Sequence, residues 1–301
     1  YFAQRLGQAD LRQAAAYLER AIAADSTYAP AWAWLGLTYS FQAEHGYTPL
    51  PEGFSRARRA SERSLEFDES LAVAYAALGY VQKNFDWDWT GASATYQKAL
   101  ALEPNNAAVL EHTASIAMTL GRIEESGEQY RRSIEIDPLV PRTHYLLGVW
   151  ALYCNKLLDA EEAFKRALEL HPEYPNTHAR LGLVYLAQDR FQKALDAVQA
   201  EVVLPRRLIG LAIVFHAMDR EEDAKLALSQ LLELEISKTF AFQIAEIYSY
   251  WGEVDQAFTW LDLAYKLRDP GLTYIKGNPY LGKVQSDPRY SVLLTKLNLP
   301  Q

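Results

Sequence analysis

The chain has 301 residues, of which 50% are hydrophobic and 23% are charged, a composition that is typical of a globular protein and excludes a disordered one. Its 38 Asp and Glu residues outnumber 30 Lys and Arg residues, and the net charge of −8 opposes non-specific binding to nucleic acid or to an anionic membrane surface. A single cysteine excludes an internal disulfide, and no apolar run approaches the roughly 18 residues needed to cross a bilayer.

A pattern with a period of 34 residues runs through most of the chain. Its first part is W-x-x-L-G-x-x-Y, formed by Trp32, Leu35, Gly36 and Tyr39. Related residues occupy the same positions further along: Tyr75, Leu78 and Gly79; His144, Leu147 and Gly148; and His178, Leu181, Gly182 and Tyr185. A second set of residues ends at Pro104, Pro138 and Pro172, which follow one another at intervals of 34. This regularity predicts a repeat protein.

Each repeat is predicted to be a pair of amphipathic helices, because its apolar residues recur at spacings of three and four. In one repeat, Gly148 and Ala160 are small where two backbones must approach, and Leu147 and Phe164 are large enough to fill the remaining space. Proline then ends the second helix. We expect Leu147 to be buried between the paired helices, so that Leu147→Ala would cost roughly 2–5 kcal/mol.

Eight repeats are predicted in chain order, as one domain that covers 1–271. The first is truncated and ends near Tyr28, and the others cover 29–71, 72–106, 107–140, 141–174, 175–204, 205–237 and 238–271. Residues 42–53 are predicted to be an insertion between paired helices. Residues 272–301 are predicted to form a C-terminal capping tail with a short helix.

The stretch 85–89 (FDWDW) places Asp86 and Asp88 at the first and third positions of a calcium-loop pattern. The twelfth position holds Gln97, where a calcium site needs a bidentate glutamate. We therefore interpret the stretch as the turn between paired helices, with Asp88 or Thr90 as the N-cap of the second helix and the tryptophans packed over the joint.

The histidines do not predict a metal site. His144 and His178 occupy the same position in successive repeats, so they should lie at least 8–10 Å apart, whereas zinc needs about 2.0–2.1 Å to each imidazole. Both are expected to line the core in place of the tryptophan of the motif. The sequence contains no H-E-x-x-H, G-x-S-x-G, P-loop or G-x-G-x-x-G motif. We therefore expect no catalytic residues, no cofactor and no metal.

The repeat motif resembles that of the tetratricopeptide repeats, whose W-x-x-L-G-x-x-Y, A-x-x-x-F-x-x-A and P pattern it matches. The resemblance implies an all-α fold, namely a right-handed α-solenoid (superhelix) of helix-turn-helix units. It also implies a non-catalytic module that binds a protein or peptide segment.

In tetratricopeptide arrays the first helices of the repeats line a concave groove. The resemblance places the following residues there as partner contacts: Tyr80, Lys83, Glu111, Ser115, Arg142, Tyr145, Val149, Asn176, Arg180 and Leu183. The Lys and Asn pair with which some members grip a C-terminal carboxylate is absent. We expect the groove to hold an amphipathic helix or a linker, with Arg142 and Arg180 orienting it. Arg142→Ala is then expected to weaken binding and to leave the melting temperature nearly unchanged.

A second resemblance is to the C-terminal repeat region of bacterial multidomain regulators. It is carried by residues 17–25, 28–32 and 85–89, and by the closing stretches 287–290 and 297–300. In those proteins a winged-helix DNA-binding domain or a class III adenylate cyclase domain is joined through a TolB-like segment to the repeats. The resemblance implies a regulatory or sensory region whose partner could be a linker or output domain of the same chain. It implies a cytoplasmic location, or a periplasmic one where a membrane span precedes the repeats.

Two other functions stay open from the sequence alone. The chain could be a free-standing scaffold or adaptor that joins other proteins. It could also be a carbohydrate-active enzyme of the α/α-toroid kind, in which the 19 tyrosines and 7 tryptophans would line a sugar cleft. The regular short period argues against the toroid enzyme, which needs paired carboxylates that face a central pocket.

Overall fold

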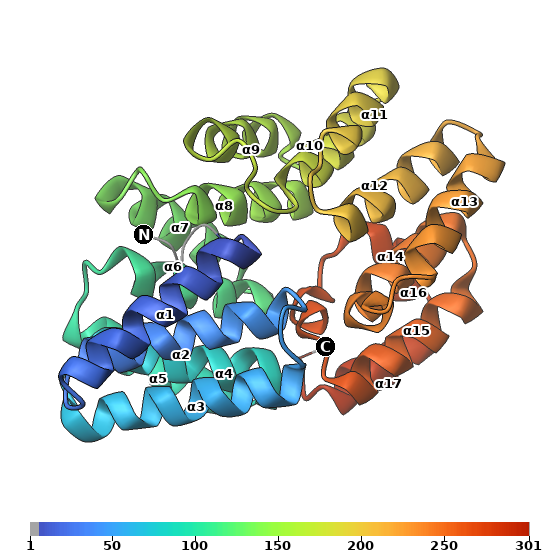
Figure 1. Cartoon of the computed structure of the whole chain (residues 1–301). Helices are drawn as coiled ribbons and strands as arrows, with labels where there is room; N and C mark the ends of the chain where they lie inside the picture. Colours follow the sequence, from blue (N-terminus) through green and yellow to red (C-terminus); the bar gives the residue numbers. More distant parts are fainter. Residues whose placement is uncertain (1–5, 301) are drawn as a thin grey trace. The chain divides into compact units, whose positions relative to one another are not determined.

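The computed structural model describes residues 6–300 (Figure 1). Over this range the chain forms 17 α-helices and no β-strand, and the α-helices hold more than two-thirds of the residues. The prediction of an all-α solenoid of helix-turn-helix repeats is therefore confirmed. Among the described helices, none combines the length and the apolar character needed to span a membrane.

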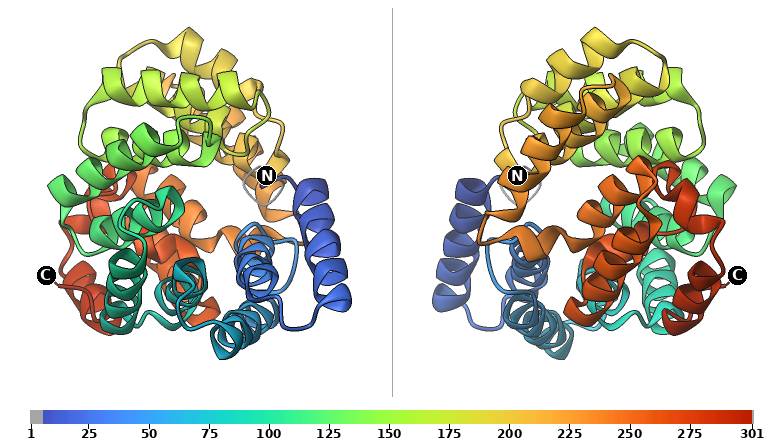
Figure 2. Two further views of the ribbon diagram at one scale, coloured as in Figure 1. Left: turned by 90° about the vertical axis from the view of Figure 1, so that its left-hand side faces the viewer. Right: turned by 90° about the vertical axis from the view of Figure 1, so that its right-hand side faces the viewer.

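The chain divides into two compact units, residues 1–143 (unit 1) and 144–301 (unit 2). The division falls in the first turn of α8 (Pro141–Tyr153). In both units, consecutive helices can be followed as hairpins along the colour gradient of Figure 2.

Unit 1 contains a single helix followed by three helix pairs. These helices are α1 (Gln8–Ala24), α2 (Ala29–Glu44), α3 (Leu50–Phe67), α4 (Ala72–Val81), α5 (Trp89–Leu102), α6 (Ala107–Thr119) and α7 (Ile123–Ile136). The partners α2 and α3, α4 and α5, and α6 and α7 pack on each other, and the first helices α2, α4 and α6 pack side by side. We call α2, α4, α6 and the start of α8 the inner helices of unit 1.

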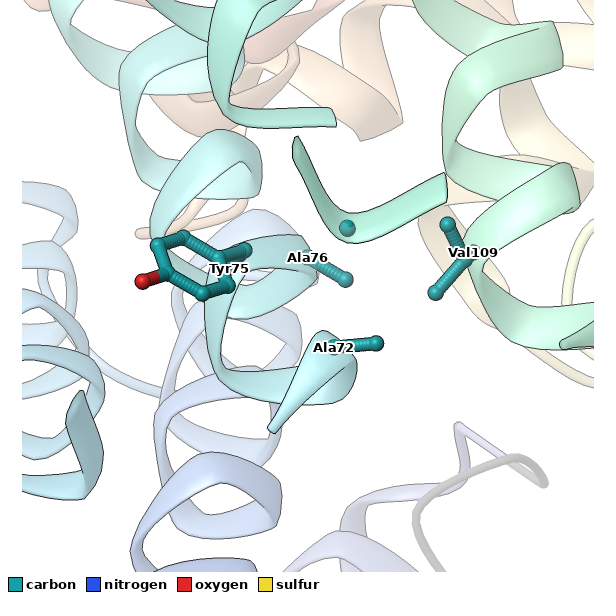
Figure 3. Packing of buried hydrophobic residues seen from close by; sticks show 5 residues of the cluster. Ala72, Tyr75, Ala76 and Val109 are labelled. Carbon is teal, nitrogen blue, oxygen red and sulfur yellow. The ribbon is translucent and has the colours of Figure 1, made fainter. Parts of the chain in front are cut away.

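Small residues allow the paired helices of unit 1 to approach closely. A Cβ atom on Gly36 of α2 would lie 2.5 Å from the Ser61 Oγ and 3.1 Å from the carbonyl oxygen of Ala57, so only glycine fits there. Between the next repeats, Ala72, Ala76 and Val109 are buried together with Tyr75 (Figure 3). The predicted use of small residues at helix contacts agrees with this packing.

Unit 2 continues the same pattern and ends in a tail. Its helices after α8 are α9 (Leu157–Leu170), α10 (Thr177–Ala187), α11 (Phe191–Gln199), α12 (Leu204–Ala217), α13 (Glu221–Leu232), α14 (Ala241–Trp251) and α15 (Val254–Leu267). The tail contains the 3-10 helices η4 (Pro270–Tyr274) and η5 (Pro279–Leu281) and the short helices α16 (Gly282–Gln285) and α17 (Pro288–Lys296). Another 3-10 helix, η3 (Ser237–Phe240), precedes α14. The tail packs on α14 and α15.

The predicted insertion at 42–53 is shorter in the structure. Helix α2 continues to Glu44 and α3 begins at Leu50, so only residues 45–49 are outside the helices. These two helices have 16 and 18 residues, whereas the following pair has 10 and 14. The segment between the paired helices therefore covers 45–49, and the other residues of the predicted insertion at 42–53 belong to the ends of α2 and α3.

The stretch 85–89 is the turn that the sequence predicted. A π-helix, η2 (Gln82–Asp86), extends α4, and Trp87 follows in the left-handed region with φ 58°. Asp88 is the N-cap of α5, and its Oδ1 accepts a hydrogen bond of 2.9 Å from the Gly91 backbone. Asp86 forms an ion pair with Arg58 of α3. Within residues 6–300, no three His, Cys, Asp or Glu residues are grouped so that they could hold a metal ion.

Two predictions about buried positions need correction. Leu147 is partly exposed, and its neighbour Leu146 is buried instead. His144 is buried as expected, but His178 is partly exposed. The His178 Nε2 lies 3.0 Å from the carbonyl oxygen of Pro172, and the Trp32 Nε1 donates over 2.9 Å to the carbonyl oxygen of Ser26. Both contacts span six residues, so histidine replaces tryptophan at this position as a hydrogen-bond donor to the preceding turn.

Candidate partner-binding site

The predicted groove residues lie mostly inside the protein. Tyr80, Lys83 and Glu111 are only 4%, 2% and 4% exposed. Burial also applies to the following residues: Ser115, Arg142, Val149, Arg180 and Leu183. Tyr145 and Asn176 are partly exposed. The groove positions therefore have partners within the chain, and these partners determine what is left open to a ligand.

In unit 1 a buried polar network connects the inner helices. Arg142 at the start of α8 forms an ion pair with Glu111 of α6. The neighbouring Thr143 donates a hydrogen bond of 2.9 Å to the other oxygen of the Glu111 carboxylate. Tyr80 of α4 donates a hydrogen bond to the carboxylate of Glu44 at the end of α2. Five side chains thus join the inner helices in two pairs, α8 with α6 and α4 with α2.

Aromatic rings hold the Arg142 guanidinium in this network. The Cζ atom of Arg142 lies 4.9 Å from the ring centroid of Phe41 and 5.9 Å from that of Tyr80. The two rings meet edge to face with centroids 5.3 Å apart. Cation–π contacts of this kind stabilise a desolvated guanidinium. Because Arg142 is buried and paired, its truncation should reduce stability, which replaces the expectation from the sequence that the melting temperature would stay nearly unchanged.

Lys83 is the most deeply buried charged side chain of the network. It stands in the π-helix η2, and its ammonium group lies 3.3 Å from the Asn84 Oδ1. The Asn84 amide in turn donates to the Tyr80 carbonyl oxygen over 2.9 Å. Burial lowers the pKa of Lys83 from 10.5 to about 7, although the nearby Glu44 carboxylate opposes this shift.

This burial predicts a specific dependence of stability on pH. The pKa of Lys83 is lower in the folded chain than in the unfolded chain, so above pH 7 the unfolded state binds more protons and the free energy of unfolding rises with pH. Lys83 should contribute an increase of about 2 kcal/mol between pH 7 and pH 9. In Lys83→Met this increase should be missing, which urea titrations of both proteins at the two pH values will measure. An equal rise in the two proteins would contradict the buried state of this lysine.

Beside the network, unit 1 contains a pocket of about 700 Å³. One wall is formed by Trp34, Leu37 and Phe41, which lie on one face of α2 at spacings of three and four. The opposite side is formed by the connections between repeats and by the helix starts that follow them: Glu103, Pro104, Asn105, Asn106, Ala107, Ala108, Glu111, His112, Ile136, Asp137, Val140, Arg142 and Thr143. This volume lies in the range of small-molecule and side-chain binding sites.

The groups that line the pocket are poorly suited to acid–base chemistry. Glu111 and Arg142 neutralise each other, and burial lowers the pKa of His112 to about 3, so this imidazole is neutral at pH 7. The His112 ring stacks on Tyr96 with centroids 5.9 Å apart. Among the described lining residues there is no serine, cysteine or lysine, and the Thr143 hydroxyl donates to Glu111, a carboxylate that is already paired with Arg142. The pocket has the volume and the apolar wall to bind a group.

Only Glu111 and Arg142 of the predicted groove residues line this pocket. The sequence analysis did not identify Trp34, Leu37, Asn105 and Val140 as site residues. A signal was present in Trp34, a second large aromatic residue two positions after the Trp32 of the repeat motif. The contributions from Asn105 and Val140 depend on the connections between repeats, which the groove positions of the repeat pattern do not include.

In unit 2 the predicted residues also contact each other. The Asn176 side chain donates a hydrogen bond of 2.7 Å to the Tyr145 hydroxyl. Arg180 lies 3.9 Å from the Glu246 carboxylate, which accepts a hydrogen bond of 2.6 Å from Asn278 in the tail. The cavity lined by Asn176, Arg180 and Leu183 has a volume of about 10 Å³, which is enough for about one water molecule. Unit 1 therefore contains the better candidate site.

Comparison with known proteins agrees with the repeat architecture. Residues 88–141 and 145–207 match the family described as tetratricopeptide repeat. A search of curated proteins finds no match to the chain.

Several solved structures share the fold. The APC/C hetero-tetramer Cut9–Hcn1 is 16% identical with a TM-score of 0.65, over 95% of this chain and 52% of that one. A tetratricopeptide repeat protein from Parabacteroides merdae is 17% identical with a TM-score of 0.55, over 82% and 99%. PilF of Pseudomonas aeruginosa is 23% identical with a TM-score of 0.53, over 70% and 93%. These similarities establish the fold as an α-solenoid of tetratricopeptide type.

Proposed function

We propose that this protein is a non-catalytic interaction module that binds a segment of a partner protein in the pocket of unit 1. The observation that carries the proposal is the cavity of about 700 Å³ between the apolar face of α2 and the connections that precede α6 and α8. Repeat solenoids offer extended surfaces of this kind to partner proteins. An apolar wall beside a few fixed polar groups suits a bulky side chain of a peptide.

Blocking the pocket should abolish this binding. Ala108 is a partly exposed lining residue at the start of α6, so a tryptophan at this position would place its ring in the cavity without replacing a core side chain. A random peptide library displayed on phage is selected on the intact chain. The affinity of the most enriched peptides is then measured by fluorescence anisotropy. Ala108→Trp should weaken these peptides at least about ten-fold, which corresponds to about 1.4 kcal/mol.

The matched control for this experiment is Ala94→Trp. Ala94 is an exposed residue on α5 and does not line the pocket, so the control adds the same ring to a helix surface outside the pocket. Its affinity for the peptides should equal that of the unchanged chain. If library selection enriches no peptides, or if Ala108→Trp binds them as tightly as Ala94→Trp does, the proposed function is wrong.

A finer proposal follows from the resemblance to bacterial regulators. We propose that the partner is a linker or output domain of a signalling regulator, namely a transcription factor or an adenylate cyclase, and that the repeats regulate it. The stretches that carry this resemblance include Asp88, the N-cap of α5, and Asp287, the N-cap of α17. These residues serve the fold of the repeats, so the support for the regulatory role comes from the resemblance alone. Reading the coding sequence upstream of Tyr1 tests it, because an output domain must be encoded there.

The free-standing scaffold is the other form that the proposed function can take. It requires the same pocket and differs only in whether the partner segment belongs to another chain. The same reading of the coding sequence separates the two, since a scaffold needs no attached output domain.

A further inference from the structure

We infer that the segment bound by the pocket of unit 1 is basic, with a bulky apolar side chain in the cavity and an adjacent lysine or arginine at the carboxylates of Glu103 and Asp137. This inference rests on the proposed function and adds the chemical class of the partner. It differs from the expectation based on the groove positions, in which arginines of this chain would orient the partner.

The first step concerns the arginines. Arg142 lines the pocket, but its charge is compensated by the buried Glu111 carboxylate and its guanidinium is held by Phe41 and Tyr80. Releasing Arg142 to a carboxylate of a partner would leave Glu111 buried without its counter-ion, which is strongly unfavourable. The pocket therefore does not offer this cation to an acidic peptide.

The second step is the charge of the pocket. Its described ionisable residues are three carboxylates, one guanidinium and the neutral imidazole of His112. After Glu111 and Arg142 are paired, the Glu103 and Asp137 carboxylates remain, and both residues are exposed. We call Glu103 and Asp137 the rim of the pocket. The exposed cation Arg132 donates to the Asn105 Oδ1, a neighbour of the rim, over 2.6 Å, so it reduces the negative charge there by at most one. The rim keeps a net negative charge.

The third step is the position of these carboxylates in the repeats. Glu103 is the C-cap of α5, and Asp137 is the C-cap of α7 in the next repeat. The C-terminal end of a helix carries a partial negative charge, so two helix ends add to the charge of the two side chains. The opposing positive end of α6 is occupied, because the Asn106 Oδ1 accepts from the amides of Ala108 and Val109 over 3.0 and 3.2 Å. A cationic side chain is therefore attracted to the rim.

The fourth step is the apolar surface next to these charges. Ile136 and Leu139, on either side of Asp137, are 42% and 67% exposed, and Ile136 also lines the pocket. Large apolar side chains so close to a carboxylate favour a ligand that combines an apolar group with a cation. A basic peptide with a bulky apolar residue has both.

The inference is tested with two synthetic peptides and two variants of the chain. One peptide is the most enriched sequence from the library selection, and the other has each Lys or Arg replaced by Glu. The double variant Glu103→Gln and Asp137→Asn removes both rim charges and keeps an oxygen acceptor for Asn106 and for the backbone of Leu139. The control Glu124→Gln and Glu128→Gln removes the same charge from exposed positions of α7 that do not line the pocket.

Selected peptides should be rich in Lys or Arg next to a bulky apolar residue. The rim variant should bind the chosen peptide about 3- to 20-fold more weakly than the control variant does, and should show a smaller loss of affinity when salt is raised. The charge-reversed peptide should bind the unchanged chain at least about ten-fold more weakly.

The outcomes distinguish this inference from the proposed function. Enrichment of acidic peptides, or equal binding by the rim and control variants, would overturn the inference, while the effect of Ala108→Trp would still support a peptide-binding pocket. If selection on the unchanged chain enriches no peptide relative to selection on the Ala108→Trp chain, both the inference and the proposed function are wrong. Binding of small cations such as arginine amide as tightly as the peptide would also overturn the inference, because a free cation would then suffice.

Discussion

Replacing Glu111 by alanine is expected to lower the free energy of unfolding of unit 1 by about 3–5 kcal/mol. The Glu111 side chain is buried, pairs with Arg142 and accepts a hydrogen bond from Thr143. Its removal would leave the Arg142 guanidinium in the interior without a counter-ion, and a buried unpaired charge costs far more than an exposed one. Urea denaturation followed by circular dichroism measures this loss.

The double variant Glu111→Ala and Arg142→Met separates the charge from the packing. Methionine keeps much of the apolar volume beside Phe41 and Tyr80 and removes the unpaired cation. We therefore expect the double variant to be more stable than Glu111→Ala alone, in the way that apolar residues can replace a buried ion pair. Glu103→Ala is the matched control, because it truncates an exposed glutamate and should change stability by no more than about 0.5 kcal/mol. A similarly small effect of Glu111→Ala would contradict the buried network.

The sequence predicted the architecture because the period of the repeats is a property of neighbouring residues. The spacing from Gly148 to Phe164 places a glycine and a phenylalanine opposite each other in paired helices, and a Cβ atom on this glycine would lie 2.7 Å from the phenylalanine ring. The same local logic identified Asp88 as a helix cap. Such contacts join residues within one repeat, so the pattern of one repeat contains both partners.

The candidate site was less predictable, because it depends on contacts between repeats. Glu111 and Arg142 belong to successive repeats, and Phe41 reaches the same guanidinium from a more distant one. A motif read repeat by repeat gives each side chain a position on the groove, but not the neighbour that covers it. The pocket itself depends on the α7–α8 connection around Val140 and on the α5–α6 connection around Asn105, whose side chains are variable parts of a repeat.

The prediction that Leu147 is buried was wrong because burial at this motif position varies between repeats. The repeat pattern places a leucine before each motif glycine, and Leu35 and Leu181 are buried at that position. Leu78 and Leu147 are partly exposed at the same position, so the burial of this leucine varies along the chain. A consensus position therefore predicts the type of residue more reliably than its burial, and the cost of truncating Leu147 should be smaller than the cost at a fully buried position.

Phe164 is a large, fully buried side chain of this helix pair, and Phe164→Ala is expected to destabilise unit 2 by about 3–5 kcal/mol. The ring packs against Gly148 of α8 and lies 5.8 Å from the Tyr145 ring, measured between centroids. Its loss would leave a cavity between α8 and α9 that the rigid helix pair cannot fully close. Phe191→Ala is the control, because this phenylalanine on α11 is 40% exposed and should cost much less. Hydrogen exchange of the α8 and α9 amides reports the local loss.

The effect of Gly148→Ala on stability should have opposite signs in the unchanged chain and in the Phe164→Ala variant. In the unchanged chain, Gly148→Ala would bring a Cβ atom to 2.7 Å from the Phe164 ring and should destabilise unit 2 by about 1–3 kcal/mol. In the Phe164→Ala chain the clash is absent, the methyl group fills part of the cavity, and alanine favours a helix over glycine by about 1 kcal/mol. The same substitution should then be stabilising. If Gly148→Ala destabilises both chains equally, the glycine is required for another reason than the ring that faces it.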